Sequence, residues 1–243
     1  MHTVIKHPLI EVKLSHLRDE KTSNKDFREE INEIASFMCF EVFKDLKTYD
    51  GEEYKTPTGA TLRKTKLEKQ IVLAPILRAG IGLCDGIVSM IPTARIGHIG
   101  MFRDEETLIP QEYYFKLPEV ENPLLVIVDP MLATGGSAIA AIDACKKRGY
   151  SDIRLMCLVG CPEGLKAIEN AHPDVHVYLA AVDERLNEKG YIMPGLGDAG
   201  DRLNGCDTKE TPRNIIQLIA DYGHNISGLY KSQLNEIERI VLG

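Results

Sequence analysis

The chain has 243 residues, which is enough for one large α/β domain or two small ones with a sizeable hydrophobic core. Its formal net charge of -7 argues against wholesale binding to nucleic acid or to an anionic membrane surface. The longest apolar runs are too short to span a bilayer, and the N-terminus lacks the apolar core of a signal peptide, so we expect a cytoplasmic protein.

The first strongly patterned element is a helix over residues 24–47. Ser23 can cap its amino end. Apolar residues recur along it at spacings of three and four, which places them on one face. They are Phe27, Ile31, Ile34, Met38, Val42 and Leu46. A turn at 56–59 follows, and we expect it to join two short strands.

From residue 69 onward, short runs rich in Val, Ile and Leu predict strands buried on both faces, because their apolar residues do not alternate cleanly. They cover 69–76, 95–102, 123–128, 153–159 and 175–182. Helical segments fall between most of them, at 80–91, 137–148 and 163–171. This alternation implies a parallel sheet with helices on both faces, and ligands bind such sheets beyond the carboxyl ends of the strands.

The cysteines form no CxxC pair, so we expect reduced and mostly buried thiols and no metal or disulfide site. They are Cys39, Cys84, Cys145, Cys157, Cys161 and Cys206.

Two loops that follow strands carry an arginine. Arg78 directly follows a buried strand, where its charge is costly unless it meets an anion or forms a structural ion pair, and the residues leave both open. Arg103 lies in a charged tip at 101–108 that continues into an alternating strand at 111–117. This tip is either a solvated hairpin or a lid that carries Arg103 onto a bound anion and excludes water.

A third loop has the composition of a phosphate site. Thr134-Gly-Gly-Ser137 stands just before the helix at 138–148, whose backbone N–H groups attract anions. The lysine of a nucleotide-triphosphate loop is missing. Asp129, at the end of the preceding strand, would repel phosphate but accepts hydrogen bonds from a vicinal diol. An anion cradle with a diol acceptor at its mouth fits a 5-phosphoribosyl group.

The fourth loop, at 187–202, is rich in glycine, and we expect neither helix nor strand in it. Its apolar residues Tyr191, Ile192 and Leu196 argue against disorder. A backbone wrapped closely around a small planar polar ligand would need such glycines. Asp198 and Asp201 could bind a metal or a sugar hydroxyl, or pair with Arg202.

Together these stretches resemble the uracil phosphoribosyltransferases, which have the type I phosphoribosyltransferase fold. The resemblance covers residues 1–208 and includes KHPL at 6–9, PILRAG at 75–80, GMFRDEETL at 100–108, VDPMLATGGSA at 128–138, HPDV at 172–175 and LNEKGYIMPGLGDAGDR at 186–202. It implies an α/β fold with a central parallel sheet of about five strands, flanking helices and a hood or flap. Residues 209–243 then form a helical C-terminal extension.

The resemblance also implies an activity, in which uracil and 5-phosphoribosyl 1-diphosphate (PRPP) give UMP and diphosphate with Mg²⁺ in pyrimidine salvage. Arg78 and Arg103 contact the diphosphate, Asp129 meets the ribose hydroxyls, and Asp198 lies near PRPP and its magnesium. Asp198 and Arg103 are the expected catalytic residues. The 5-phosphate is cradled by Pro130, Met131, Leu132, Ala133, Thr134, Gly135, Gly136 and Ser137. Uracil is read at Ile192, Gly197, Asp198 and Ala199.

Pro130 favours the uracil branch, because many relatives acting on other bases place a second acid there. The alternative function is a PRPP- or nucleotide-sensing regulatory protein on the same fold, which would have a damaged base loop or lid; the sequence shows neither.

Assembly and regulation stay open at this point. Some family members are activated by GTP and form dimers or tetramers, so a homodimer or homotetramer and a GTP effector are expectations here. The extension at 209–243 is patterned as two amphipathic helices. These helices either pack on their own subunit or build an oligomer contact.

Overall fold

The structure is a computed structural model that describes residues 1–103 and 110–206, except for the side chains of residues 102, 103 and 110. Residues Met1–Asn204 form one compact unit. The predicted extension at 209–243 lies outside the described residues, so its boundary and its two helices stay predictions. None of the helices in the described ranges has the length and apolar character needed to cross a membrane.

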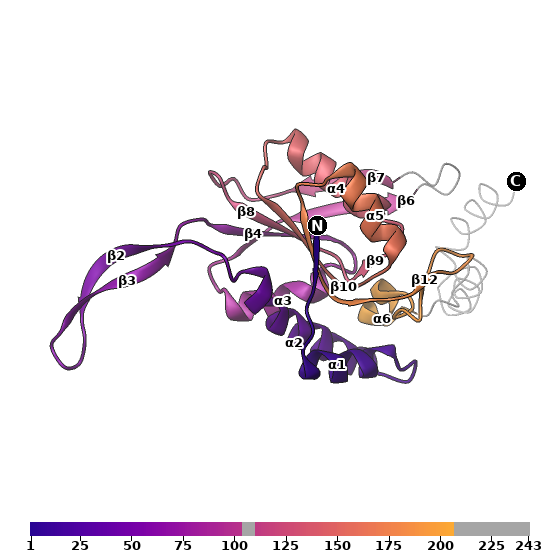
Figure 1. The fold of residues 1–243 in the computed structure, drawn as a ribbon, viewed down its shortest axis with the longest axis horizontal. Coiled ribbons are helices and arrows are strands. Elements are labelled where there is room, and N and C mark those ends of the chain that lie inside the picture. The colour runs from indigo at the N-terminus through magenta and orange to yellow at the C-terminus, as the bar shows by residue number, and fades with distance from the viewer. Residues whose placement is uncertain (104–109, 207–243) are drawn as a thin grey trace, which may run out of the picture. The chain divides into compact units, whose positions relative to one another are not determined.

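A nine-stranded sheet runs through this unit in the order β1-β11-β10-β8-β4-β6-β7, with β5 beside β4 and β9 beside β10 (Figure 1). Its strands are β1 His2–Val4, β4 Ile71–Leu77, β5 Arg95–Ile96, β6 His98–Arg103, β7 Pro110–Lys116, β8 Leu124–Val128, β9 Met131–Leu132, β10 Ile153–Gly160 and β11 His176–Val182. The pairings are parallel except between β6 and β7. The predicted α/β class with a central, mostly parallel sheet is confirmed.

The sheet is wider than the five strands expected from the sequence. The N-terminal segment adds β1 beside β11. The apolar run at 95–102 is divided into β5 and β6 at Gly97, whose N–H donates to the Leu73 carbonyl at 2.9 Å. Neither feature has a periodic sequence signal, because one strand has three residues and the other two.

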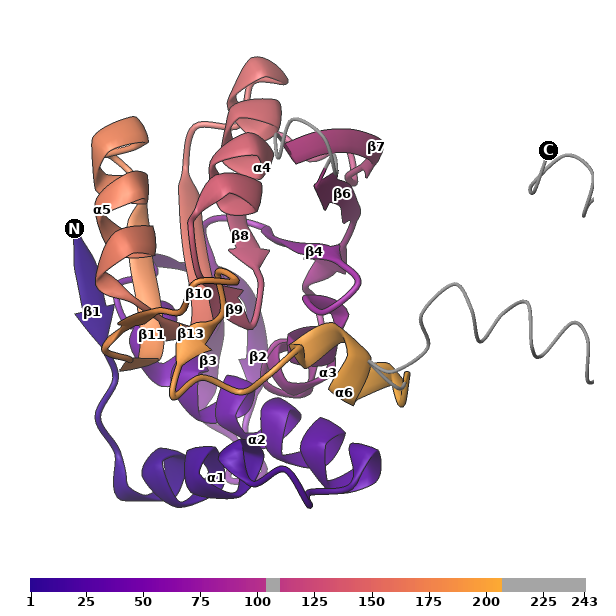
Figure 2. The ribbon, with the colours of Figure 1, turned by 90° about the vertical axis from the view of Figure 1, so that its right-hand side faces the viewer.

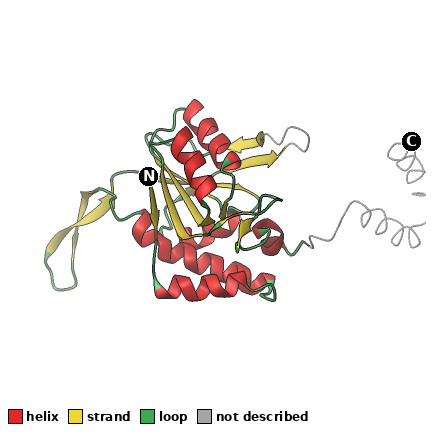
Figure 3. Cartoon of the chain, turned by 45° about the vertical axis from the view of Figure 1, so that its right-hand side comes forward, coloured by secondary structure: helices red, strands yellow, loops and turns green. Residues whose placement is uncertain are grey.

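Helices cover both faces of the sheet (Figures 1 and 3). One face carries α1 Pro8–Arg18, α2 Asn24–Val42 and α3 Ile81–Met90, and the other carries α4 Gly136–Lys147 and α5 Pro162–Ala171. The Ser23 side chain accepts the Asp26 N–H and caps α2, as predicted. The helix ends at Val42 and not at 47, because the chain turns at Phe43 and Arg154 of β10 donates to the Val42 carbonyl. Leu46 still packs against the core from that turn.

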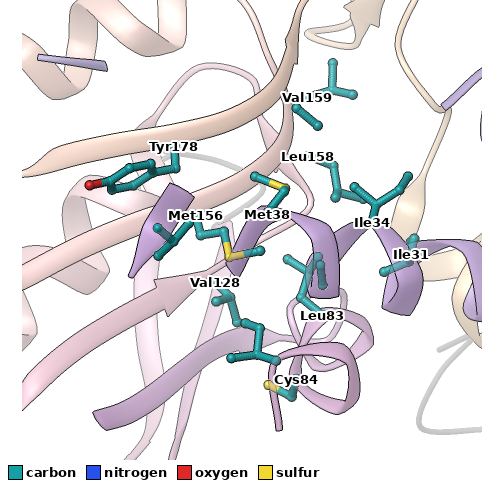
Figure 4. Close-up of a cluster of buried hydrophobic side chains, with 14 of the residues drawn as sticks. Ile31, Ile34, Met38, Leu83, Cys84, Val128, Met156, Leu158, Val159 and Tyr178 are labelled. Carbon is teal, nitrogen blue, oxygen red and sulfur yellow. The ribbon is translucent and has the colours of Figure 1, made fainter. Parts of the chain in front are cut away.

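The core explains why the strands do not alternate in sequence. In β8, Leu124, Val126 and Val128 enter the cluster beneath α1–α3, whereas Leu125 and Ile127 enter the cluster beneath α4 and α5. Figure 4 shows the first cluster, where side chains of α2 and α3 meet Val128 of β8 and Met156 of β10. Both faces of the central strands β4, β8 and β10 are therefore dry, and polar chemistry is confined to their ends.

A separate two-stranded hairpin extends away from the nine-stranded sheet (Figure 1). It consists of β2 Thr48–Lys55 and β3 Thr61–Leu67, which pair antiparallel around the predicted turn at 56–59. Nearly all of its residues are exposed, and it pairs with no other strand in the described part of the chain.

Close packing between α2 and α3 gives a test of the fold. We expect Gly86→Ala to lower the free energy of unfolding by about 1–3 kcal/mol, since the new Cβ would clash with the backbone carbonyl of Asn32 and press on Ala35. Gly82→Ala, one turn earlier on α3, is the matched control, because its nearest neighbours are the methyl ends of Leu203, which can move. Urea unfolding of the two variants measures the difference. Equal stability losses would contradict the packing described.

Candidate active site

A pocket of about 210 Å³ opens where β4 and β8 end. It is lined by Ile76, Leu77, Arg78, Ala79, Met101, Asp129, Ser137, Asp198 and Gly200. A smaller pocket of about 80 Å³ shares Asp129 and Ser137 with it and is otherwise lined by Met131–Gly136 and Ala138. Residues from all four predicted loops therefore meet at one place, with Met101 contributed by the second loop.

The small pocket has the geometry of an anion cradle. Gly135 adopts a left-handed conformation (φ 82°) before α4, and in the described structure no side chain caps that helix end. The first N–H groups of a helix lack acceptors within the helix and carry its positive dipole end. The Thr134 hydroxyl accepts only a long bond, 3.4 Å, from the Gly136 N–H. The turn is thus open to an anionic ligand.

The cradle is supported from below by the start of α5. The Cys161 thiol donates to the Ala133 carbonyl at 3.1 Å, and the Cys161 N–H donates to the Leu132 carbonyl at 3.3 Å. A Cβ on Gly164 would come within 2.6 Å of the Leu132 carbonyl oxygen. Glycine at this position lets α5 approach the loop backbone closely.

Pro130 differs from the rest of the predicted cradle. It is buried, and its carbonyl accepts the N–H groups of Leu158 and Val159 at 3.1 and 3.0 Å. Within the described residues it does not line the cradle pocket. These two hydrogen bonds connect the end of β8 to β10.

Asp129 stands between the two pockets. Burial raises the pKa of its carboxyl from 3.8 to about 7, and the Met131 N–H, at 3.4 Å, opposes this rise only in part. A carboxyl so placed gains from any donor that enters the pocket. Hydroxyl groups of a vicinal diol are suitable donors.

Arg78 lies at the mouth of the larger pocket, after a cis Leu77–Arg78 peptide bond. Its guanidinium donates to Asp201 Oδ1 at 2.7 Å, and 57% of the side chain is exposed. An exposed pair contributes about 0–1 kcal/mol. An anionic group can therefore replace Asp201 beside Arg78 at small cost, which is compatible with both roles that the sequence leaves open.

The glycine-rich fourth loop contains more regular structure than the sequence suggests. The expectation of neither helix nor strand is wrong, because β13 Ile192–Met193 pairs with β12 Arg185–Leu186, and α6 spans Ala199–Asn204. Asp198 Oδ1 accepts the Asp201 N–H at 2.9 Å in the first turn of α6. Of the predicted uracil contacts, Asp198 lines the larger pocket, whereas Ile192, Gly197 and Ala199 are not among its lining residues, and Ile192 and Ala199 are buried.

The predicted lid falls largely outside the described residues. Arg103 is the last residue of β6, and neither its side chain nor residues 104–109 are described. Its contact with an anion stays a prediction. The strand on the far side of the tip, β7, is present as predicted.

The donor set suits a metal ion that is held together with its substrate. No group of three or more His, Cys, Asp or Glu side chains suited to a metal occurs in residues 1–103 and 110–206. Asp198 and Asp201 nevertheless lie at adjoining positions beside the pocket. Mg²⁺ is commonly bound by one or two carboxylates, water and substrate phosphates.

Two residues that bond to the fourth loop are not predicted from the sequence. Arg18 and Asp183 form an ion pair whose members also bond to the fourth loop. Asp183 comes directly after β11 as Asp129 comes directly after β8, and this position at a strand end was the available signal. Arg18 carries no local signal, because its partner is 165 residues away.

Comparison with known proteins identifies the family. The family model described as uracil phosphoribosyltransferase matches residues 4–206. The chain belongs to the uracil phosphoribosyltransferase family. The uracil phosphoribosyltransferase of Streptococcus suis is 58% identical over 203 residues, which cover 83% of this chain and 97% of that protein. The uracil phosphoribosyltransferase of Geobacillus kaustophilus is 57% identical over the same coverage.

A solved structure agrees with this family's fold as seen here. A protein from Aquifex aeolicus superimposes with a TM-score of 0.78 at 40% identity, covering 84% of this chain and 97% of that one. The family match ends at residue 206, next to the boundary of 208 that the sequence predicts for the phosphoribosyltransferase domain.

The pKa of Asp129 gives a prediction for the protein without substrate. The folded-state pKa of Asp129, about 7, lies above the ordinary value of 3.8. The carboxyl therefore makes its full contribution to the free energy of unfolding below pH 3.8, and this contribution is lost as the pH rises through 7. Asp129→Asn should not lose this stability at high pH, because asparagine does not ionise. We expect its melting temperature to match the wild type near pH 4 and to exceed it by a few degrees at pH 8, by calorimetry.

Asp45→Asn is the control of opposite sign. The Arg154 guanidinium lowers the pKa of Asp45, so this carboxylate stabilises the fold above its unfolded pKa and its removal should slightly lower the melting temperature at pH 8. A melting temperature of Asp129→Asn at or below that of the wild type at pH 8 would refute the burial argument.

Proposed function

We propose that the protein transfers the 5-phosphoribosyl group of PRPP to N1 of uracil, giving UMP and diphosphate in pyrimidine salvage. Membership of the uracil phosphoribosyltransferase family over residues 4–206 supports this reaction. The observation that carries it in the structure is Asp129, which is shared by an anion cradle and by a pocket bordered by Arg78 and Asp198. PRPP carries its 5-phosphate, its ribose diol and its diphosphate in the same order as the cradle, Asp129 and the pocket beside Arg78.

The ribosyl phosphate is placed by two contacts. The 5-phosphate binds the N–H groups of the turn at 134–137, at the amino end of α4. Asp129 accepts the ribose hydroxyls, which replaces the solvation that its burial removes. The substrate is thereby fixed at both ends of the ribose, and C1 points toward the larger pocket.

The departing diphosphate is stabilised by positive charge. As the C1–O bond breaks, negative charge grows on the diphosphate, so arginines aimed there stabilise the transition state more than the ground state. Arg78 exchanges Asp201 for the diphosphate, and Arg103, the last residue of β6, is its second predicted contact. Asp198 would hold magnesium together with PRPP, and the ion would supply further positive charge against the departing diphosphate.

Uracil is held by the fourth loop. Backbone groups at Ile192, Gly197, Asp198 and Ala199 pair with its edge and present N1 to C1. The C1–N1 bond forms as the C1–O bond breaks, and the N1 proton leaves to water; positioning alone accounts for much of the rate. Cytosine has an amine where uracil has O4, and a mismatched buried pair costs on the order of a hundredfold.

The alternative, a PRPP- or nucleotide-sensing regulator, has no observation in its favour. Such a protein should have a damaged base loop or lid. The base loop is folded and its Asp198 borders the same pocket as Asp129, whereas the lid lies largely outside the described residues.

The decisive experiment is UMP formation from radiolabelled uracil and PRPP with Mg²⁺. The wild type should turn over, and Asp198→Asn should lose about 10²–10³-fold in kcat with a smaller change in KM for uracil, because a charge beside the ribosyl centre acts mainly in the transition state. Asp152→Asn, at the opposite end of β10, is the control and should keep wild-type kinetics. Binding of both substrates without turnover by the wild type would refute the proposed reaction.

We also propose a homodimer or homotetramer, with GTP as a candidate effector. The β2–β3 hairpin supports association, because an isolated two-stranded hairpin is marginally stable in water and this one exposes Tyr49, Tyr54, Leu62 and Leu67. A second copy of the chain would cover it. The cytoplasmic location stays a prediction from sequence.

Size-exclusion chromatography tests the assembly. The full-length protein and the 1–208 truncation should both elute as oligomers, whereas a variant whose residues 48–67 are replaced by a short linker should shift to the monomer. Adding GTP to each tests the effector. A hairpin deletion that leaves the elution volume of the oligomer unchanged would exclude the hairpin as the contact.

A further inference from the structure

In residues 1–103 and 110–206, Asp183 is one of two polar residues that are buried. It does not line the larger pocket, where we propose that the reaction occurs. It follows β11 directly, and its N–H donates to the Gly160 carbonyl at 2.8 Å, which fixes it to the end of the sheet. Its side chain is 6% exposed and pairs with Arg18, the last residue of α1. A buried charge of this kind must have partners.

The partners include the loop that is proposed to bind uracil. The Arg18 guanidinium donates to both carboxylate oxygens of Asp183, at 2.8 and 2.7 Å, and to the Gly195 carbonyl at 2.8 Å. The Gly195 N–H donates to Asp183 Oδ2 at 2.8 Å. A single ion pair therefore holds the N–H and the carbonyl of one loop residue at the same time.

Gly195 is a sensitive point of this loop. It follows the cis Met193–Pro194 peptide bond, has φ 64°, and its hypothetical Cβ would collide with the Ile192 carbonyl oxygen. Only glycine fits such a turn without strain. The backbone at Ile192 lies on one side of Gly195 and the proposed uracil contacts 197–199 on the other, so the orientation of Gly195 sets the spacing between them.

The next residue, Leu196, is held by Arg202 of α6, which also bonds to the end of α1. The Arg202 guanidinium donates to the Leu196 carbonyl at 2.9 Å, to the Asp19 carbonyl at 2.7 Å and to the Leu17 carbonyl, and it lies 4.2 Å above the Phe27 ring. Figure 2 shows the loop around β13 between the sheet and the helices α1 and α2. The end of α1 thus anchors two successive residues of the loop.

Stability alone does not account for the pair. A buried ion pair often adds no net stability compared with apolar side chains of similar size, because desolvation of the two charges offsets their attraction. What a bidentate pair supplies is geometry, since the planar guanidinium fixes both partners at once. Backbone groups that read a base must be held within a fraction of an ångström.

We propose that Arg18 and Asp183 are positioning residues for uracil recognition. They hold Gly195 so that the backbone on either side of it presents a uracil-shaped set of donors and acceptors. The inference rests on the proposed function, because it assumes that this loop binds uracil. It assigns no contact with PRPP to either residue.

Steady-state kinetics of Asp183→Asn test the proposal. The amide keeps the shape of the side chain, but its NH₂ group cannot accept the second guanidinium N–H, so the bidentate pair and the negative charge are lost. We expect KM for uracil to rise about 10- to 100-fold and the preference for uracil over cytosine to fall, with KM for PRPP within about twofold of the wild type. Arg18→Lys keeps the charge but loses the fork, so it should change the same parameters less.

Asp152→Asn is the matched control. It removes a carboxylate that pairs with Lys69 at 2.7 Å, away from the fourth loop, and should leave both KM values and the base preference unchanged. All assays are run below the melting transition of each variant. If Asp183→Asn does not fold, Arg18→Lys carries the test.

The outcomes separate the two proposals. Failure of the proposed function appears as a wild type that forms no UMP, before any variant is compared. A purely structural pair would lower kcat or the active fraction while leaving KM for uracil and the base preference at wild-type values. That result, or equal rises in KM for both substrates, would overturn the positioning role.

Discussion

Burial of the sheet on both faces is the constraint on which this structure depends. The strands β4, β8 and β10 are covered by α1–α3 on one side and by α4 and α5 on the other, so no polar group can be tolerated along them without a partner. Ionisable side chains therefore occur where strands end. Asp129 after β8 and Asp183 after β11 are both results of this rule, and so is Arg78 after β4.

The two carboxylates differ in their partners, since Asp183 is buried and Asp129 is half-buried at the pocket. Asp183 is neutralised internally by Arg18 and a backbone N–H, so its charge is fully used inside the protein. Asp129 has one weak backbone donor and a raised pKa, so its charge is available to a ligand. The contrast separates a residue that shapes a loop from a residue that meets a substrate.

Much of the fold follows from local patterns. The cap at Ser23, the buried strands and the turn at 56–59 were all predictable, since each depends on residues close in sequence. The end of α2 was not, because it is fixed by Arg154 from a distant strand. Likewise β13 and α6 lie in a glycine-rich segment whose structure is imposed by pairing with β12 and by Asp198, and propensity alone argues against both.

The site was predictable to a similar depth. Arg78 and Asp129 were predicted from their positions after strands, Ser137 from the turn before a helix, and Asp198 from the glycine-rich loop, and the structure brings all four to one pocket. The family resemblance assigned Pro130 to the cradle, whereas in the structure its carbonyl is bonded to β10 of the sheet. The Arg18–Asp183 pair joins the first helix to the last strand, and a single sequence offers no means of matching such distant partners.

The raised pKa of Asp129 has one more consequence, which concerns proton balance. If the ribose hydroxyls donate to this carboxyl as proposed, they favour its ionised form, and binding of the sugar near neutral pH is then accompanied by release of part of a proton into solvent.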